Sequence, residues 1–133
     1  MIMLLSIALG GAVGAVSRYG VTLAITSIYG AGFQPLATLL VNAIGSGLMG
    51  LCYGVLTAGA GMGVGLSDPL RGIIMVGFLG ALTTFSSFAL DAAVLFEKGQ
   101  GGLALGYVLA SVAISLISFA MMLFIVKTMA TGQ

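Results

Sequence analysis

The sequence has 133 residues, of which 60% are hydrophobic and 5% are charged, and its formal net charge is +1. A soluble domain carries about 25% charged residues, so this composition excludes a water-exposed globular surface and indicates a protein surrounded by lipid. The chain has no histidine and a single cysteine, which excludes a disulfide framework and Cys/His metal sites. Its low net charge provides no basic surface for nucleic acid.

Four apolar stretches are long enough to cross a bilayer as helices, which takes about 20 residues. They lie at residues 2–28, 36–58, 70–96 and 103–126. Short glycine-rich linkers at 29–35, 59–69 and 97–102 predict tight turns between them. The sequence therefore predicts one all-α integral membrane domain over residues 1–133, in which neighbouring helices run antiparallel.

Small residues recur at four-residue spacing on the first two spans. Gly10 and Gly14 form a GxxxG pattern, and Ser46, Gly50 and Gly54 continue the same spacing on the second span. This spacing lets helices pack closely in membranes. Four helices of this length make a thin bundle that can hardly enclose a pore, so we expect the chain to form oligomers.

The basic residues give little preference for one orientation in the membrane. Four spans put both ends of the chain on one side with Arg71 and Lys127, while Lys98 lies on the other side and Arg18 lies within the first span. The positive-inside rule needs an excess of Lys and Arg on one side, and this excess is almost absent. The pattern favours insertion in both orientations and pairing of the chain with its inverted copy.

Polar side chains inside membrane spans are costly, and they are functional candidates by default. Arg18 either extends its charge to the membrane interface or lines a water-filled vestibule that attracts anions. Thr38, Asn42 and Ser46 follow one another at i, i+4 and i+8, which is the spacing of one helix face. Asn42 is either a hydrogen-bonding link between helices or a donor to a permeating anion.

The fourth span carries a series of hydroxyl groups. Tyr107, Ser111, Ser115 and Ser118 fall within an arc of about 80° on a helix. Serines can bond back to their own helix carbonyls, but such serines need not share a face. The alignment favours a continuous polar track along this helix.

The third span contains the segment GALTTFSSF, residues 80–88. Consecutive Thr and Ser compete with the helix for backbone hydrogen bonds, and Gly77 and Gly80 lower the helical preference. We expect a break near residues 80–83. Carbonyls freed there would form a cation site with a symmetry mate, and the N-terminus of the following half-helix would attract an anion.

Phe85 and Phe88 lie three residues apart on that half-helix. They are either ordinary core residues or part of an anion site, because the edge of an aromatic ring is positive. A small dehydrated anion can contact ring edges and hydroxyls without a fixed cation that would hold it too tightly. The flanking hydroxyl residues favour the anion site.

Four motifs together resemble a known family, the Fluc fluoride channels, also called CrcB. They are GGAVGAVSRY, TLLVNAIGSGLMG, GFLGALTTFSSF and the hydroxyl track of the fourth span, and they cover nearly the whole chain. The resemblance implies a dual-topology, antiparallel homodimer with two separate fluoride pores in the bacterial inner (plasma) membrane. Passive export of fluoride through this channel would give fluoride resistance.

The resemblance also implies roles for individual residues. Phe85 and Phe88 match the phenylalanine box, Asn42 matches the pore asparagine, and Arg18 matches the vestibule arginine. The backbone carbonyls at the positions of Gly80 and Thr83 hold a structural sodium ion on the dimer axis in this family. The remaining pore positions implied by the resemblance are Ser86, Ser87, Thr38, Tyr107, Ser111 and Ser115.

Three positions depart from the common family pattern. The usual motif is TTFSTF, so Ser87 retains the hydroxyl and lacks the methyl group. Ala81 replaces a second glycine, which restricts the backbone near the expected break. Asp91 stands where a glutamate is expected, and the sequence assigns it no role.

Other function classes fit the sequence less well. A small four-span, proton-coupled multidrug exporter needs a carboxylate embedded in the first span, and Asp91 in the third span is the only candidate. A structural assembly factor would not need an aligned polar track. The chain has no Ser/His arrangement, aspartate pair or metal-ligand cluster for catalysis, so we do not expect an enzyme.

Overall fold

The computed structural model describes residues 1–59 and 67–131. The helices are α1 (Ile2–Tyr29), η1 (Ala31–Phe33), α2 (Gln34–Gly59), α3 (Asp68–Arg71), η2 (Gly72–Leu79), α4 (Gly80–Leu82), α5 (Phe85–Glu97) and α6 (Gly101–Thr131). Four helical stretches in the described ranges are long and apolar enough to cross a membrane: Ile2–Tyr29, Ala31–Thr57, Asp68–Glu97 and Gly101–Ala130. The all-helical class and the four spans are therefore confirmed. The linker expected at 59–69 falls mainly outside the described residues.

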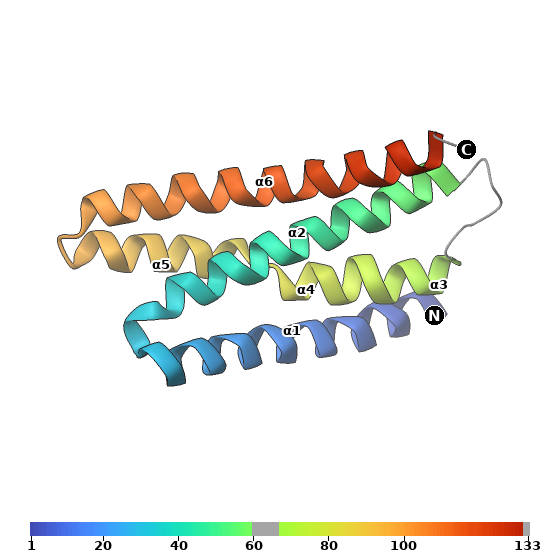
Figure 1. Ribbon diagram of the computed structural model, residues 1–133. Helices are drawn as coiled ribbons and strands as arrows, with labels where there is room; N and C mark the ends of the chain where they lie inside the picture. Colours follow the sequence, from blue (N-terminus) through green and yellow to red (C-terminus); the bar gives the residue numbers. More distant parts are fainter. Residues whose placement is uncertain (60–66, 132–133) are drawn as a thin grey trace.

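The spans lie side by side as an elongated bundle (Figure 1). Elements α3, η2, α4 and α5 follow one another along the third span, and the two termini lie at the same end of the bundle. Helix α6 runs beside α2 and α5, and α1 packs against η2. This arrangement brings the middle of the third span between α1 on one side and α2 and α6 on the other.

Glycines allow α1 and the third span to approach closely. Element η2 is a π-helix, a wide form that usually occurs as short segments near functional sites. A Cβ atom added to Gly10 or Gly14 would collide with the backbone carbonyls of Ile73 and Phe78, respectively. The GxxxG pattern of α1 therefore faces η2, where only a residue without a side chain fits.

The interface between α2 and α6 is built in the same way. A Cβ atom on Gly50 would collide with the backbone carbonyl of Phe119, and one on Gly54 would lie 2.9 Å from the Cβ atom of Val126. Small residues at four-residue spacing thus let the two helices pack at backbone distance. This contact fixes the polar residues of α6 against those of α2.

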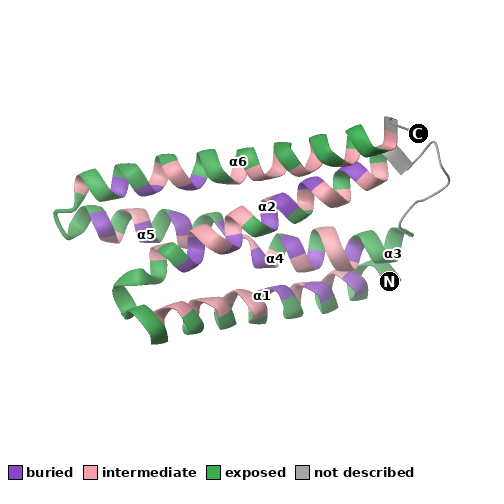
Figure 2. Cartoon of the chain, viewed as in Figure 1, coloured by how far each residue is buried: buried purple, intermediate pink, exposed green. Residues whose placement is uncertain are grey.

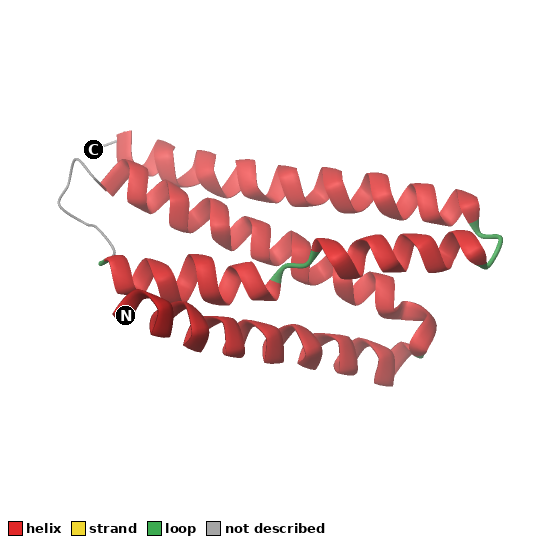
Figure 3. Cartoon of the chain, turned by 180° about the vertical axis from the view of Figure 1, so that it is seen from behind, coloured by secondary structure: helices red, strands yellow, loops and turns green. Residues whose placement is uncertain are grey.

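The third span is not helical throughout. Helix α4 ends at Leu82, and α5 begins at Phe85. Between them Thr83 has φ −77° and ψ 152°, and Thr84 has φ −152° and ψ 119°, so both residues are extended. Figure 3 shows this segment as a short loop in the middle of the bundle.

Burial is concentrated where the spans face one another (Figure 2). One hydrophobic cluster contains Phe88, Leu95, Ala104 and Tyr107. A second cluster contains Val41, Leu79 and Leu82. Large apolar side chains on the outer faces are mostly exposed, as expected for a chain whose surroundings are lipid or another subunit.

Candidate functional site

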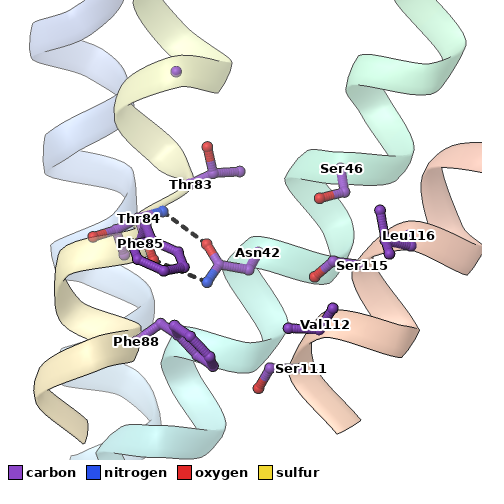
Figure 4. A pocket seen from close by; sticks show the side chains of 11 residues that line it. Asn42, Ser46, Thr83, Thr84, Phe85, Phe88, Ser111, Val112, Ser115 and Leu116 are labelled. Atoms are coloured by element: carbon purple, nitrogen blue, oxygen red, sulfur yellow. Dashed lines mark hydrogen bonds between the residues drawn. The ribbon is translucent and has the colours of Figure 1, made fainter. Parts of the chain in front are cut away.

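Asn42 of α2 binds the backbone of the extended segment. Its Nδ2 group donates to the Thr84 carbonyl at 3.0 Å, and the Thr84 N–H donates to Asn42 Oδ1 at 2.7 Å (Figure 4). The nitrogen and the oxygen of the Asn42 amide therefore both bond to the backbone of Thr84, which lies 42 positions away in the sequence. Of the two roles open to Asn42, the link between helices is present in the structure. The role of anion donor stays a prediction, for which one amide hydrogen is still available.

Thr84 also begins α5. Its Oγ1 atom accepts a hydrogen bond from the Ser87 N–H at 3.2 Å, the usual N-cap arrangement of a threonine. The same hydroxyl lies 3.2 Å from Ser86 Oγ and 3.1 Å from Ser87 Oγ. The hydroxyl residues of this motif thus form one cluster around the N-terminus of α5.

These bonds change the partners of two backbone carbonyls. In an uninterrupted helix, Thr84 N–H would bond to the Gly80 carbonyl, and Ser87 N–H would bond to the Thr83 carbonyl. In the structure Thr84 N–H bonds to Asn42, and Ser87 N–H bonds to the Thr84 side chain. The carbonyls of Gly80 and Thr83 are thereby released, and oxygen ligands of this kind suit a hard monovalent cation.

A cavity of about 440 Å³ opens beside this segment. Its lining residues, all in the described part of the chain, carry no charge and come from α2, the third span and α6. They include eight of the residues singled out in the sequence: Asn42, Ser46, Gly80, Thr83, Phe85, Phe88, Ser111 and Ser115. We call this space the aromatic cavity.

Two features of the aromatic cavity suit a small anion. Phe85 and Phe88 lie with ring centroids 5.4 Å apart and planes tilted by 43°, and Phe85 is 79% exposed whereas Phe88 is 9% exposed. Ser111 is 4% exposed, and its Oγ atom has no hydrogen-bond partner among the described residues. Burial of a hydroxyl without a good partner is costly, so Ser111 can turn its hydrogen toward a ligand or toward the neighbouring Tyr107 hydroxyl.

A second cavity, also of about 440 Å³, lies on the other side of Thr84. It is lined by four further residues from the sequence prediction, Arg18, Thr38, Ser86 and Ser87, together with Gln34 and five others. We call this space the arginine cavity. Its lining mixes a positive charge, hydroxyls and apolar groups, in contrast to the uncharged aromatic cavity.

The polar face predicted for α2 divides between these two spaces. Asn42 and Ser46 line the aromatic cavity, and Thr38 lines the arginine cavity. Each four-residue step rises about 6 Å along the helix and turns the side chain by about 40°, and Thr38 and Ser46, eight residues apart, line different cavities. The hydroxyl track of α6 divides similarly, because Ser111 and Ser115 line the aromatic cavity whereas Tyr107 does not.

Tyr107 instead connects the aromatic rings to a buried carboxylate. Its ring packs against Phe88 with a centroid distance of 5.5 Å, and its hydroxyl donates to Asp91 Oδ2 at 3.4 Å. Thr38 Oγ1 donates to the same oxygen at 2.6 Å, and Gln34 Nε2 donates to Asp91 Oδ1 at 2.9 Å. Sequence reasoning gave Asp91 no role and missed Gln34, because no local signal pairs residues 57 positions apart.

Four membrane-length helices, of which three spans line an uncharged cavity, define a multi-pass membrane protein with a candidate path for a small solute. The family model described as "CrcB-like protein, Camphor Resistance (CrcB)" matches residues 5–123, and the chain belongs to this family. This confirms the resemblance inferred from the sequence motifs.

Similar proteins from three bacteria carry the name "Fluoride-specific ion channel FluC". The protein from Erythrobacter litoralis is 45% identical over 124 residues, 90% of this chain and 89% of that protein. Its counterpart from Cereibacter sphaeroides is 43% identical over 113 residues, 85% of each chain. The protein from Saccharophagus degradans is 43% identical over 117 residues, 87% of this chain and 83% of that protein.

Proposed function

We propose that this protein is a fluoride-selective passive ion channel. Its family membership and the name shared by its relatives support fluoride as the permeating ion. The observation that carries the proposal is the aromatic cavity, which is lined by a tilted phenylalanine pair and by Ser111, whose buried hydroxyl has no hydrogen-bond partner among the described residues. This combination replaces the hydration shell of a small hard anion without a fixed positive charge.

Fluoride would pass from the arginine cavity to the aromatic cavity. Arg18 raises the local anion concentration at the entrance, and the hydroxyls of Ser86 and Ser87 supply the first donors, beside Thr38 whose own hydrogen is donated to Asp91. Deeper in the path, fluoride accepts hydrogen bonds from the spare Asn42 amide hydrogen and from the serines of α6, and it contacts the ring edges of the phenylalanines. Binding of this kind is favourable but shallow, and conduction requires that balance.

The functional unit that we propose is an antiparallel, dual-topology homodimer with two pores. Phe85 is 79% exposed in the single chain, so an inverted second copy would cover it and complete the aromatic cavity. The two sides of the membrane carry nearly equal numbers of basic residues, which supports insertion in both orientations. This assembly, and not a single chain, would seal each pore from lipid.

A structural sodium ion at the dimer axis is part of the proposal. The carbonyls of Gly80 and Thr83 lose their helical donors to Asn42 and Thr84, which leaves oxygen ligands available. Two carbonyls from each copy would hold the ion. The described residues contain no group of three or more His, Cys, Asp or Glu side chains for a metal, so carbonyl ligation is the chemistry that fits.

The proposed role is fluoride export across the bacterial inner membrane. Hydrogen fluoride that diffuses inward dissociates in the more alkaline cytoplasm, and the inside-negative potential drives the anion out through a passive path. A proton-coupled multidrug exporter is not supported, because the relatives are named as ion channels. Asp91 is the candidate carboxylate for such an exporter. Both of its oxygens already accept hydrogen bonds, from Gln34, Thr38 and Tyr107.

Fluoride efflux from proteoliposomes tests the proposal. Purified protein is reconstituted with fluoride or chloride inside, and release is started with a potassium ionophore and followed with an ion-selective electrode. We expect rapid fluoride release with chloride retained and with no pH gradient required. Absence of fluoride release, or release only with an imposed proton gradient, would refute a passive fluoride channel.

A further inference from the structure

Asp91 is a buried carboxylate that lines neither cavity but accepts hydrogen bonds from residues beside both. It is 4% exposed, and it belongs to α5 within the third membrane span. The donors that bind it are all neutral side chains, Gln34, Thr38 and Tyr107. Because a buried carboxylate is strongly destabilising without hydrogen bonds, each of these donors matters to its position.

The three donors are divided unequally between the two carboxylate oxygens. Oδ2 accepts the hydroxyls of Thr38 and Tyr107, at 2.6 and 3.4 Å. Oδ1 accepts the side-chain amide of Gln34, at 2.9 Å. Gln34 is therefore the residue that occupies Oδ1 and leaves Oδ2 for the two hydroxyls.

The two hydroxyl residues belong to different parts of the path. Thr38 lines the arginine cavity. Tyr107 packs against Phe88, whose ring is tilted against Phe85 in the aromatic cavity. A change in the orientation of Asp91 would consequently move groups in both cavities at once.

We propose that Gln34 is a positioning residue of the permeation path, acting through Asp91; this inference rests on the proposed channel function. Without the Gln34 amide, Oδ1 loses its donor at a part-buried contact, and the carboxylate turns to share the hydroxyls now bound to Oδ2. Thr38 and Tyr107 then leave their positions, and the Phe88 ring follows Tyr107.

A role for Gln34 confined to its own helix does not account for its contacts. Gln34 is the first residue of α2. Its amide reaches Asp91, 57 positions away. The Gln34 carbonyl lies 3.4 Å from Thr38 Oγ1, but the single hydrogen of that hydroxyl goes to Asp91 at 2.6 Å.

The first experiment compares Gln34→Leu with Gln100→Leu, a matched change in the loop after α5 that touches neither cavity. Fluoride efflux is measured over a range of internal fluoride concentrations, and chloride release is measured in parallel. We expect Gln34→Leu to lower the maximal rate about tenfold, as for the loss of one hydrogen bond to a charged group. Gln100→Leu should stay within about twofold of wild type, since a change at an exposed surface position usually has a small effect.

A pair of compensating changes in side-chain length tests whether the lost contact, and with it the fluoride efflux rate, can be restored. Gln34→Asn shortens the donor by one methylene, and Asp91→Glu lengthens the acceptor by one methylene. Each single change should reduce the rate, and the double variant should regain much of it, because the amide again reaches the carboxylate. Wild-type flux in Gln34→Leu, or no rescue in the double variant, would overturn the positioning role.

A stability cycle separates this inference from the proposed function. Thermal unfolding in detergent is compared for Gln34→Leu, Asp91→Asn and the double variant. Non-additive effects would show that the two side chains are coupled in the folded protein, and additive effects would refute the contact. If wild-type protein released no fluoride, the channel function and the permeation role would both fail, while the cycle would still report the contact.

Discussion

Replacement of Asn42 by aspartate is the most informative change at the centre of this molecule. The two side chains have nearly the same shape, and the carboxylate retains an acceptor for the Thr84 N–H, which the Oδ1 atom of Asn42 accepts at 2.7 Å. The change removes the donor that binds the Thr84 carbonyl at 3.0 Å. It also places a negative oxygen opposite that carbonyl.

The magnitude follows from these two hydrogen bonds. Loss of the donor leaves a buried carbonyl without its partner, which costs about 1–3 kcal/mol. We therefore expect Asn42→Asp to lower the free energy of unfolding by about 1–3 kcal/mol. The new charge also faces the aromatic cavity, where it repels fluoride by about 4 kcal/mol at a distance of about 4 Å and an effective dielectric constant of about 20. A barrier of that size lowers flux about a thousandfold.

Two measurements check this prediction. Fluoride efflux from proteoliposomes gives the loss of conduction, and thermal unfolding in detergent gives the loss of stability. Thr57→Val on the same helix is the control, because the Thr57 hydroxyl is exposed and bonds only to carbonyls of its own helix. Wild-type stability in Asn42→Asp would refute the role of the amide in holding Thr84. Reduced stability with wild-type flux would refute the repulsion of fluoride at this position.

Three further changes test other parts of the reasoning. Phe85→Ile should reduce fluoride efflux by about tenfold or more while size-exclusion chromatography shows the proposed dimer unchanged, because isoleucine keeps an apolar side chain at this 79% exposed position for the second copy to cover; retained flux would contradict the pore assignment. Gly50→Ala should lower the unfolding free energy by about 1–3 kcal/mol, because its Cβ would collide with the backbone of α6. Gly106→Ala is the control for that change, since its Cβ meets nothing within 4 Å, and equal melting temperatures for the two variants would contradict the packing argument. Replacement of sodium by a large organic cation during purification should lower fluoride efflux, because the carbonyls of Gly80 and Thr83 would lack their ion; unchanged efflux in sodium-free buffer would argue against the site.

The membrane spans could be predicted from the sequence because their signal is local. Length and hydropathy alone define four apolar stretches, and the structure has four helical spans at the corresponding places. The hydroxyl-rich segment was also visible as a local anomaly in an apolar span. Motifs such as TTFSSF and VNAIGS then identified the family without any structural information.

The arrangement of the polar residues could not be predicted in the same way. Helical spacing placed Thr38 and Asn42 on one face, but the extended residue Thr84 lies between the two cavities that they line. The pairing of Gln34 with Asp91 depends on the approach of α2 to α5 and has no signature along the chain. Residues 72–79 form a π-helix, which an apolar stretch with two glycines does not distinguish from an α-helix.

The hydrogen bonds around Thr84 explain why an extended segment is tolerated in the middle of a membrane protein. An unpaired N–H or carbonyl is costly there because no water is available. Asn42 satisfies the N–H and carbonyl of Thr84, and the Thr84 hydroxyl satisfies the N–H of Ser87. The side chains thus supply partners for the donors of the segment, whereas the carbonyls of Gly80 and Thr83 are left as acceptors.

A segment whose donors are satisfied and whose acceptors are available attracts a cation on the carbonyl side, and the N-terminus of α5 next to it favours an anion. The same few hydrogen bonds therefore prepare both ion sites that we propose.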